Sequence, residues 1–102
     1  MDVGMVGLGR MGANMAARLK RGGHRVAGFD PGAGARQGAQ QAHGLETFDS
    51  LEALVAALPA PRALWLMVPA GTAVDGALAT LLPWLQAGDV VVDGGNSNYR
   101  DS

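Results

Sequence analysis

The feature of this sequence that most constrains its fold is a regular alternation of short apolar runs with longer segments of helical spacing. The runs predicted as strands are Val3–Val6, Arg25–Asp30, Thr47–Phe48, Ala63–Val68 and Val90–Asp93. The run ALWLMV at 63–68 contains no polar residue. Such a run is typical of a strand that is buried on both faces of a sheet.

Helices are predicted between the strands, over residues 10–20, 33–43, 50–58 and 72–82. In the first helix, Met11, Met15 and Leu19 recur every fourth residue and define one apolar face. Asp49 and Glu52 have the spacing of a capping box that would open the third helix.

Strands and helices that alternate in this way form a parallel sheet with right-handed crossovers. We therefore expect an α/β fold, a doubly wound parallel sheet of the Rossmann type. Its element order would be βαβαβαβαβ, with strand order 3-2-1-4-5-6 truncated after the fifth strand. Residues 1–102 would make up one incomplete domain. Ligands of such sheets bind beyond the carboxyl ends of the strands, so a site is expected in the loops that follow them.

Composition excludes several classes of function. The chain has 102 residues, of which 48% are hydrophobic, a formal net charge of -1 and no cysteine. The basic residues are scattered, so nothing predicts a nucleic-acid or membrane surface. Without cysteine there is neither a disulfide nor a thiolate metal site, and no apolar run approaches the roughly 20 residues of a membrane span. We expect a cytoplasmic protein without a bound metal.

The segment GLGRMG, residues 7–12, has the G-x-G-x-x-G spacing of a dinucleotide-binding turn. The spacing alone is weak evidence, but here it follows a predicted strand and opens a predicted helix. Gly7 would permit the tight turn, Gly9 would let the main chain approach a pyrophosphate, and Gly12 would allow close helix–strand packing. Amides at the helix start would bind the anion. The alternative is a turn without a ligand, and for Arg10 a phosphate contact and a solvated side chain both stay open.

Asp30 ends the second predicted strand, 18 residues beyond Gly12. A carboxylate there can accept hydrogen bonds from the hydroxyls of an adenosine ribose, and it would repel a 2′-phosphate, which favours NAD over NADP. One alternative is that Asp30 only caps the turn that follows it. Arg36 opens another, because a cation shortly after this strand can accommodate NADP.

Two further segments follow predicted strands, VPAG at 68–71 and DGGNSNYRD at 93–101. Together with GLGRMG they resemble the 6-phosphogluconate dehydrogenase family, and the likeness extends along the whole chain. The GLGRMG region is shared by the wider β-hydroxyacid dehydrogenase superfamily. The DGGNS segment is more specific, because the hydroxyisobutyrate dehydrogenase branch carries a D-x-S-T type motif at that point.

The resemblance implies a role for each matching position. The pyrophosphate would lie at residues 7–12 and the adenosine ribose at 30–32, while residues 68–70 would pass beside the cofactor. Asn96 would reach both the nicotinamide end and the sugar phosphate substrate. The cofactor-binding residues implied in this way are Gly7, Leu8, Gly9, Arg10, Met11, Gly12, Asp30, Pro31, Gly32, Val68, Pro69, Ala70 and Asn96.

The resemblance also bears on the choice of cofactor. Many NADP-using members carry Asn-Arg-Thr where this chain has Asp30-Pro31-Gly32. That departure fits the NAD-preferring branch of the family, in agreement with the interpretation of the Asp30 carboxylate. We therefore expect NAD as the cofactor and NADP as the weaker ligand.

The family's reaction is the oxidative decarboxylation of 6-phosphogluconate to ribulose 5-phosphate in the pentose phosphate pathway. Its Ser-Gly-Gly loop, its general-base lysine, a His-Asn pair and an all-helical domain all follow the stretch that this chain matches. We therefore expect no catalytic residue within 1–102, an inactive fragment, and a homodimer at full length. Two other hypotheses stay open: a stand-alone dinucleotide-binding module without catalysis, and a sibling 3-hydroxyacid dehydrogenase.

Overall fold

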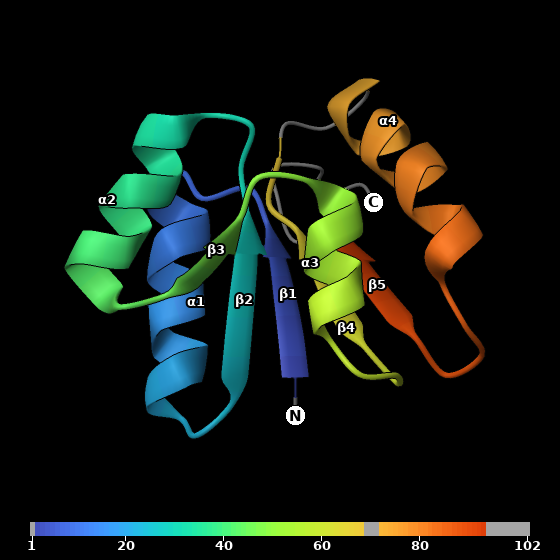
Figure 1. Cartoon of the computed structure of the whole chain (residues 1–102), viewed down its shortest axis with the longest axis horizontal. Helices are drawn as coiled ribbons and strands as arrows, with labels where there is room; N and C mark the ends of the chain where they lie inside the picture. The colour runs from blue at the N-terminus through green and yellow to red at the C-terminus, as the bar shows by residue number, and fades with distance from the viewer. Residues whose placement is uncertain (1, 69–71, 94–102) are drawn as a thin grey trace.

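The computed structural model describes residues 2–68 and 72–93, which are drawn in colour in Figure 1. Strands and helices alternate along these residues as the sequence predicts. The elements are β1 (Asp2–Val6), α1 (Arg10–Arg21), β2 (Arg25–Phe29), α2 (Ala33–His43), β3 (Glu46–Phe48), α3 (Leu51–Ala57), β4 (Ala63–Leu66), α4 (Thr72–Leu81), the 3-10 turn η1 (Leu82–Trp84) and β5 (Val90–Asp93).

The strands form one parallel sheet in the order β3-β2-β1-β4-β5. β1 lies at the centre, where Val6 pairs with Phe29 of β2 on one side and with Leu66 of β4 on the other. Helices α1 and α2 cover one face of the sheet, and α3 and α4 cover the other (Figure 1). The predicted α/β class, the double winding and the order of the five strands are therefore confirmed.

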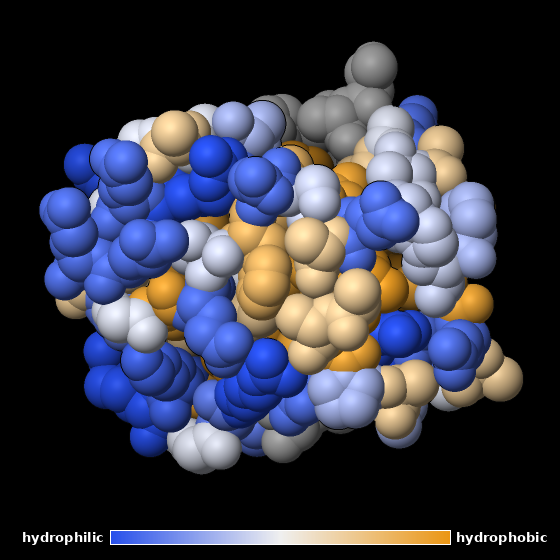
Figure 2. All heavy atoms as spheres, in the orientation of Figure 1, coloured by the Kyte–Doolittle hydropathy of each residue, from blue (hydrophilic) through white to orange (hydrophobic). Residues whose placement is uncertain are grey.

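Alternate side chains of the central strands enter two separate hydrophobic cores. In β1, Val3 and Met5 pack toward α1 and α2, whereas Val6 packs with Leu64 and Leu66 toward α3 and α4. The residues that α1 and α2 bury are small, namely Gly12, Ala16, Ala17 and Ala39, so these helices can lie close to the sheet. Figure 2 shows mostly hydrophilic residues over α1 and α2, while the apolar residues gather nearer to α3.

Helix α3 begins one residue later than the predicted capping box requires. Ser50 is its N-cap, and the Ser50 hydroxyl accepts a hydrogen bond from the Ala53 amide at 3.1 Å. The capping box that begins at Asp49 is therefore wrong, because Ser50 takes that position and the third helical residue is Ala53. Glu52 still lies in the first turn, where a negative charge favours the helix dipole.

Other boundaries also differ from the prediction by one or two residues, and three of them matter here. β2 ends at Phe29, so Asp30 lies just beyond the strand, and β4 ends at Leu66. Helix α4 ends at Leu81 and continues as a 3-10 turn. Pro83 explains this change, because it has no N–H group with which to continue the α-helical hydrogen bonds.

A buried ion pair between Arg62 and Asp89 joins the amino ends of β4 and β5. Arg62 Nη1 lies 2.9 Å from Asp89 Oδ2, and the side chains are 10% and 1% exposed. Arg62 Nε also donates to the carbonyls of Val55 and Leu58, which ties α3 to the same point. The pKa of Asp89 is lowered, first by the hydrogen bond from the Gln86 amide and then by those from Arg62.

The lowered pKa of Asp89 makes the stability of the fold depend on pH on the acid side. The folded carboxyl group binds a proton less readily than the unfolded one. Its contribution is therefore present above the ordinary value of 3.8 and is lost as the pH falls through the lower folded pKa. We expect Asp89→Asn to lower the melting temperature at neutral pH and to flatten its decline below about pH 5.

Circular dichroism melting curves at a series of pH values would measure this dependence. Asp75→Asn is the control for removing an exposed carboxylate, because Asp75 lies in the first turn of α4 and its replacement should cost only its helix-dipole contribution of about 0.3–1 kcal/mol. An Asp89→Asn variant that loses stability with acid as steeply as the wild type would contradict the role given to this ion pair.

Candidate functional site

The loops after β1, β2 and β4 converge at the carboxyl end of the sheet. The Gly7 amide donates to the Phe29 carbonyl, and the Met67 amide donates to the Val6 carbonyl, both at 2.7 Å. A Cβ placed on Gly7 would lie 3.2 Å from Val68 Cγ1. Residues 7–12, the end of β2 and Val68 are thus neighbours, as expected where parallel strands end on the same side of a sheet.

The fold itself requires two of the three glycines in GLGRMG. Gly7 has a φ of 103°, and a Cβ on this residue would overlap the Met67 carbonyl oxygen. A Cβ on Gly12 would overlap the Gly7 carbonyl oxygen. The tight turn predicted at Gly7 and the close packing predicted at Gly12 are therefore both present.

Gly9 differs from the other two glycines. Its φ of -67° is open to any residue, and a Cβ on it would meet no atom of the described residues within 4 Å. Packing within the described part of the chain therefore gives no reason for a glycine here. A molecule that approaches the main chain closely at this point would give one.

The N-terminus of α1 offers main-chain donors beside Gly9. Gly9 is the N-cap and has no side chain with which to cap the helix, no other described side chain does so, and the first turn contains no acidic residue. Basic residues lie at both ends of α1: Arg10 is its first residue, and Arg18, Lys20 and Arg21 lie in its last turn. Because the first amides of a helix lack partners within it and carry the positive end of its dipole, this end of α1 favours an anion such as a phosphate.

Both carboxylate oxygens of Asp30 accept hydrogen bonds from main-chain amides. Oδ2 accepts from Leu8 and Oδ1 accepts from Gly32, each at 2.8 Å. The second bond is the turn cap that sequence reasoning held as an alternative role for Asp30. A cap and a ribose contact are compatible, because an ionised carboxylate can accept about four hydrogen bonds.

Arg36 lies beside Asp30. Its Nη1 donates to the Asp30 main-chain carbonyl at 2.7 Å, in partly buried surroundings. The guanidinium group has five N–H donors, so others are left for a ligand at the end of β2. Sequence reasoning placed Arg36 in the following helix and missed this contact, as it missed the bond between Leu8 and Asp30. The Asp-Pro-Gly turn signals only the bond from Gly32.

The remaining predicted residues differ in exposure. Leu8 is buried and Val68 is half-buried. The exposed residues are Arg10, Met11, Pro31 and Gly32. Pro69, Ala70 and Asn96 lie outside the described residues, and their roles stay predictions. Within the described residues, no cluster of His, Cys, Asp or Glu could hold a metal ion, and no helix is both long and apolar enough to cross a membrane.

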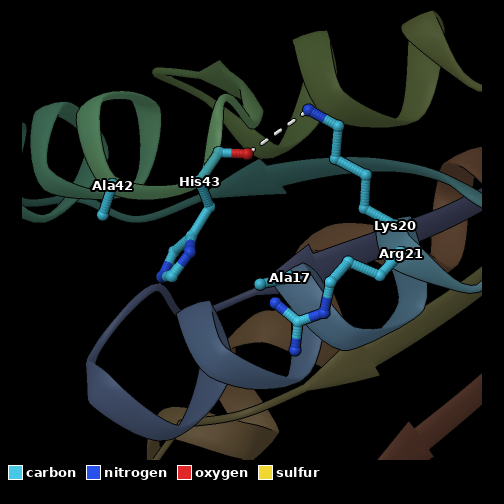
Figure 3. Close-up of a pocket in the computed structure, with 5 residues that line it drawn as sticks. All are labelled: Ala17, Lys20, Arg21, Ala42 and His43. Carbon is cyan, nitrogen blue, oxygen red and sulfur yellow. Dashed lines mark hydrogen bonds between the residues drawn. The ribbon is translucent and has the colours of Figure 1, made fainter.

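Two of the hollows that border α1 are also lined by α2. A groove of about 320 Å³ runs from Leu8 and Gly9 between α1 and α2, so it adjoins the predicted site. A cavity of about 400 Å³ lies at the other end of α1, where the His43 ring and the Arg21 side chain flank Ala17 (Figure 3). There Lys20 Nζ donates to the main-chain carbonyls of His43 and Gly44, at 3.3 Å and 2.7 Å. Lys20 thus places a positive charge at the C-terminal end of α2, and Arg21 places one at the C-terminal end of α1. Both charges are favourable to the helix dipoles, which gives the two side chains a structural role.

Sequence comparisons agree on one family. The family described as "NAD binding domain of 6-phosphogluconate dehydrogenase" matches residues 2–102. The NAD(+)-dependent, decarboxylating 6-phosphogluconate dehydrogenase of Haloferax volcanii is 48% identical over 102 residues, which are 100% of this chain and 34% of that protein. The decarboxylating enzyme of Treponema pallidum is 42% identical over 105 residues, covering 99% of this chain and 22% of that protein.

Solved structures agree with the sequence comparisons. The 6-phosphogluconate dehydrogenase of Plasmodium falciparum, known in its apo form and in complexes with its cofactor NADP+ and its substrate 6-phosphogluconate, matches with a TM-score of 0.88 at 26% identity. The match covers 100% of this chain and 23% of that one. Arogenate dehydrogenase of Synechocystis matches with a TM-score of 0.76 at 27% identity, over 89% of this chain and 31% of that one. The chain thus spans about a third or less of the length of these relatives.

The glycines provide a test that separates binding from folding. We expect Gly9→Ala to lower the free energy of unfolding by no more than about 1 kcal/mol, the difference between glycine and alanine at an N-cap, because the added Cβ meets no atom of the described residues. The same change should weaken NAD binding at least about tenfold, or about 1.4 kcal/mol. Gly12→Ala should instead destabilise the fold by about 1–3 kcal/mol, because its Cβ would overlap the Gly7 carbonyl.

Denaturant unfolding and calorimetric titration with NAD measure the two effects. Gly76→Ala controls the NAD titration, because Gly76 lies in α4, outside the GLGRMG loop; its own stability should rise by about 0.5–1 kcal/mol, the gain of alanine over glycine inside a helix. Unaltered NAD affinity in the Gly9→Ala variant would show that no ligand approaches the main chain there.

Proposed function

Because this chain belongs to the 6-phosphogluconate dehydrogenase family, whose NAD-binding domain it matches over residues 2–102, we propose that it holds the cofactor for the oxidative decarboxylation of 6-phosphogluconate. The observation that carries the proposal is the open space at Gly9, for which packing in the described residues gives no reason. The titration of the Gly9→Ala variant described above tests it directly.

Each part of the loop would have its own task in binding. Amides at the start of α1 would donate to the pyrophosphate, and the free acceptor positions of Asp30 would receive the adenosine ribose hydroxyls. When bound, NAD supplies the hydride acceptor for the family's reaction. In that reaction hydride leaves C3 of the sugar acid, and the resulting 3-keto acid loses carbon dioxide to give ribulose 5-phosphate.

The Asp30 carboxylate supports a preference for NAD. A 2′-phosphate on the adenosine ribose would bring negative charge next to it, which is unfavourable. The Haloferax volcanii relative, 48% identical to this chain, is named as NAD(+)-dependent.

Arg36 supports the opposite preference. Its guanidinium lies at the Asp30 carbonyl, 2.7 Å away, where a cation could accept a 2′-phosphate. The Plasmodium falciparum relative has NADP+ as its cofactor. Asp30 and Arg36 therefore have opposite effects on cofactor preference at the end of β2. We propose that the Asp30 carboxylate has the larger effect, so that NAD is preferred.

Calorimetric titration of the chain with NAD and with NADP tests this preference. We expect tighter binding of NAD, and we expect Asp30→Ser to narrow the difference in binding free energy by about 1–3 kcal/mol, because the charge-assisted hydrogen bonds of the carboxylate are lost. Arg36→Gln separates the alternatives, because it should weaken NADP binding more than NAD binding in the Asp30→Ser background. Tighter binding of NADP by the wild type would overturn the proposal.

The substrate and assembly of the whole protein are also proposals, drawn from the family. We propose that the intact protein takes 6-phosphogluconate, that Asn96 contacts both the nicotinamide end and the substrate, and that the protein is a cytoplasmic homodimer. The alternatives are a stand-alone dinucleotide-binding module and a sibling 3-hydroxyacid dehydrogenase. The likeness to arogenate dehydrogenase shows that this domain also occurs in dehydrogenases with other substrates. Turnover of candidate substrates by the full-length protein distinguishes them.

A polypeptide of residues 1–102 should form no ribulose 5-phosphate above background. The family's general-base lysine lies beyond the stretch matched here, and a positioned acid or base typically contributes about 10²–10⁴-fold to rate. An assay of NADH formation with 6-phosphogluconate, run beside the full-length protein as the positive control, measures this. Product formation by the 102-residue chain would place the catalytic groups within it.

A further inference from the structure

Two consecutive amides of the GLGRMG loop are bound by the end of β2. The Gly7 amide donates to the Phe29 main-chain carbonyl at 2.7 Å. The next amide, that of Leu8, donates to the Asp30 carboxylate at 2.8 Å across 22 residues of sequence. Among residues 2–68 and 72–93, no side chain accepts a hydrogen bond from the amides that follow at the start of α1. The loop is thus divided into two inner amides held by β2 and outer amides available to a ligand.

The Leu8 side chain fixes the same residue from the other side. It is 3% exposed and belongs to the core beneath α1 and α2. It occupies the space above Gly28 of β2, where a Cβ would lie 2.8 Å from Leu8 Cδ2. The bond to Asp30 therefore acts on a residue whose side chain is already packed, so little freedom is left to the main chain at this point.

The acceptor is itself held in place. Asp30 Oδ1 accepts from the Gly32 amide at 2.8 Å, and the Asp30 main-chain carbonyl accepts from Arg36 at 2.7 Å. A hydrogen bond from an amide to an ionised carboxylate is stronger than one between neutral groups. Asp30 therefore provides a fixed, charged anchor for the loop.

From this geometry we propose that Asp30 is a positioning residue for the phosphate-binding loop, in addition to any contact with a ribose. By holding the Leu8 amide, it fixes the direction of the amides from Gly9 onward before a dinucleotide arrives. A ligand that meets an ordered loop does not bear the entropic cost of ordering it, so affinity for the pyrophosphate group rises. This inference rests on the proposed function, because it assumes that the ligand is a dinucleotide.

Varying the ligand as well as the protein distinguishes the two roles of Asp30, namely its contact with the ribose and its positioning of the loop. An NAD analogue whose adenosine ribose is 2′,3′-dideoxy lacks the hydroxyls that Asp30 would receive, but it keeps the pyrophosphate. If Asp30 acted only on the ribose, wild type and Asp30→Ala would bind this analogue equally. If Asp30 also positions the loop, Asp30→Ala should bind the analogue about tenfold more weakly, in line with the loss of one charge-assisted hydrogen bond.

Calorimetric titration of the wild type, Asp30→Ala and Asp30→Asn with NAD and with the analogue performs this comparison. Asp30→Asn keeps one acceptor oxygen and should recover part of the loss. Asp75→Ala, at an exposed site on α4, is the control for removing a carboxylate elsewhere. Equal affinity of wild type and Asp30→Ala for the analogue would overturn the positioning role while leaving the proposed function intact.

Amide hydrogen exchange in the ligand-free chain gives a second readout that does not depend on cofactor binding. We expect the Leu8 amide to exchange at least about tenfold faster in Asp30→Ala, while amides of β1 and β4 keep their wild-type rates and so report an intact fold. Unchanged exchange at Leu8 would overturn the inference. If the wild type bound neither NAD nor the analogue, the proposed function would fail, and exchange at Leu8 would still decide whether Asp30 orders the loop.

Discussion

Between β1 and α1 the chain passes next to the Met67 carbonyl oxygen, and only a residue without a side chain fits there. Gly7 takes a positive φ at this point, and Gly12 lies against the Gly7 carbonyl in the first turn of the helix. Because both positions are glycines and carry no Cβ, α1 can start directly above the end of β1. The start of α1 therefore lies where β2 and β4 also end, and the site depends on this placement.

Helices α1 and α2 also pack close to the sheet. The residues that α1 and α2 bury are glycine or alanine, so both helices can lie near the sheet and leave a groove between them that reaches the loop. On the other face, α3 and α4 bury larger side chains, among them Leu54, Val55 and Leu81. The fold thus uses its small residues on the side where a ligand would approach the main chain. Gly9 is the one glycine of GLGRMG that the described structure does not need.

The sequence predicted the order of elements, the strand order and the separate tasks of Gly7 and Gly12. These follow from periodicity and from topological rules that act over short stretches or on the whole fold. The bonds from Leu8 to Asp30 and from Arg62 to Asp89 were not predicted, because their partners lie 22 and 27 residues apart and meet only in three dimensions. The misplaced cap at Asp49 reflects a shift of one residue, since Asp49 and Ser50 both suit an N-cap. The cofactor preference is open for a different reason, because Asp30 and Arg36 carry opposite charges at one place.

An NMR titration of the 102-residue chain with NAD tests most directly whether the division of the loop into held and available amides is correct. We predict that the amide resonances of Gly9 to Gly12 shift most, while the β1 and β4 resonances move little. If those loop amides stayed unchanged and the resonances of Lys20, Arg21 and His43 moved instead, the dinucleotide would bind at the cavity in Figure 3, and the site built on Gly9 and Asp30 would be wrong.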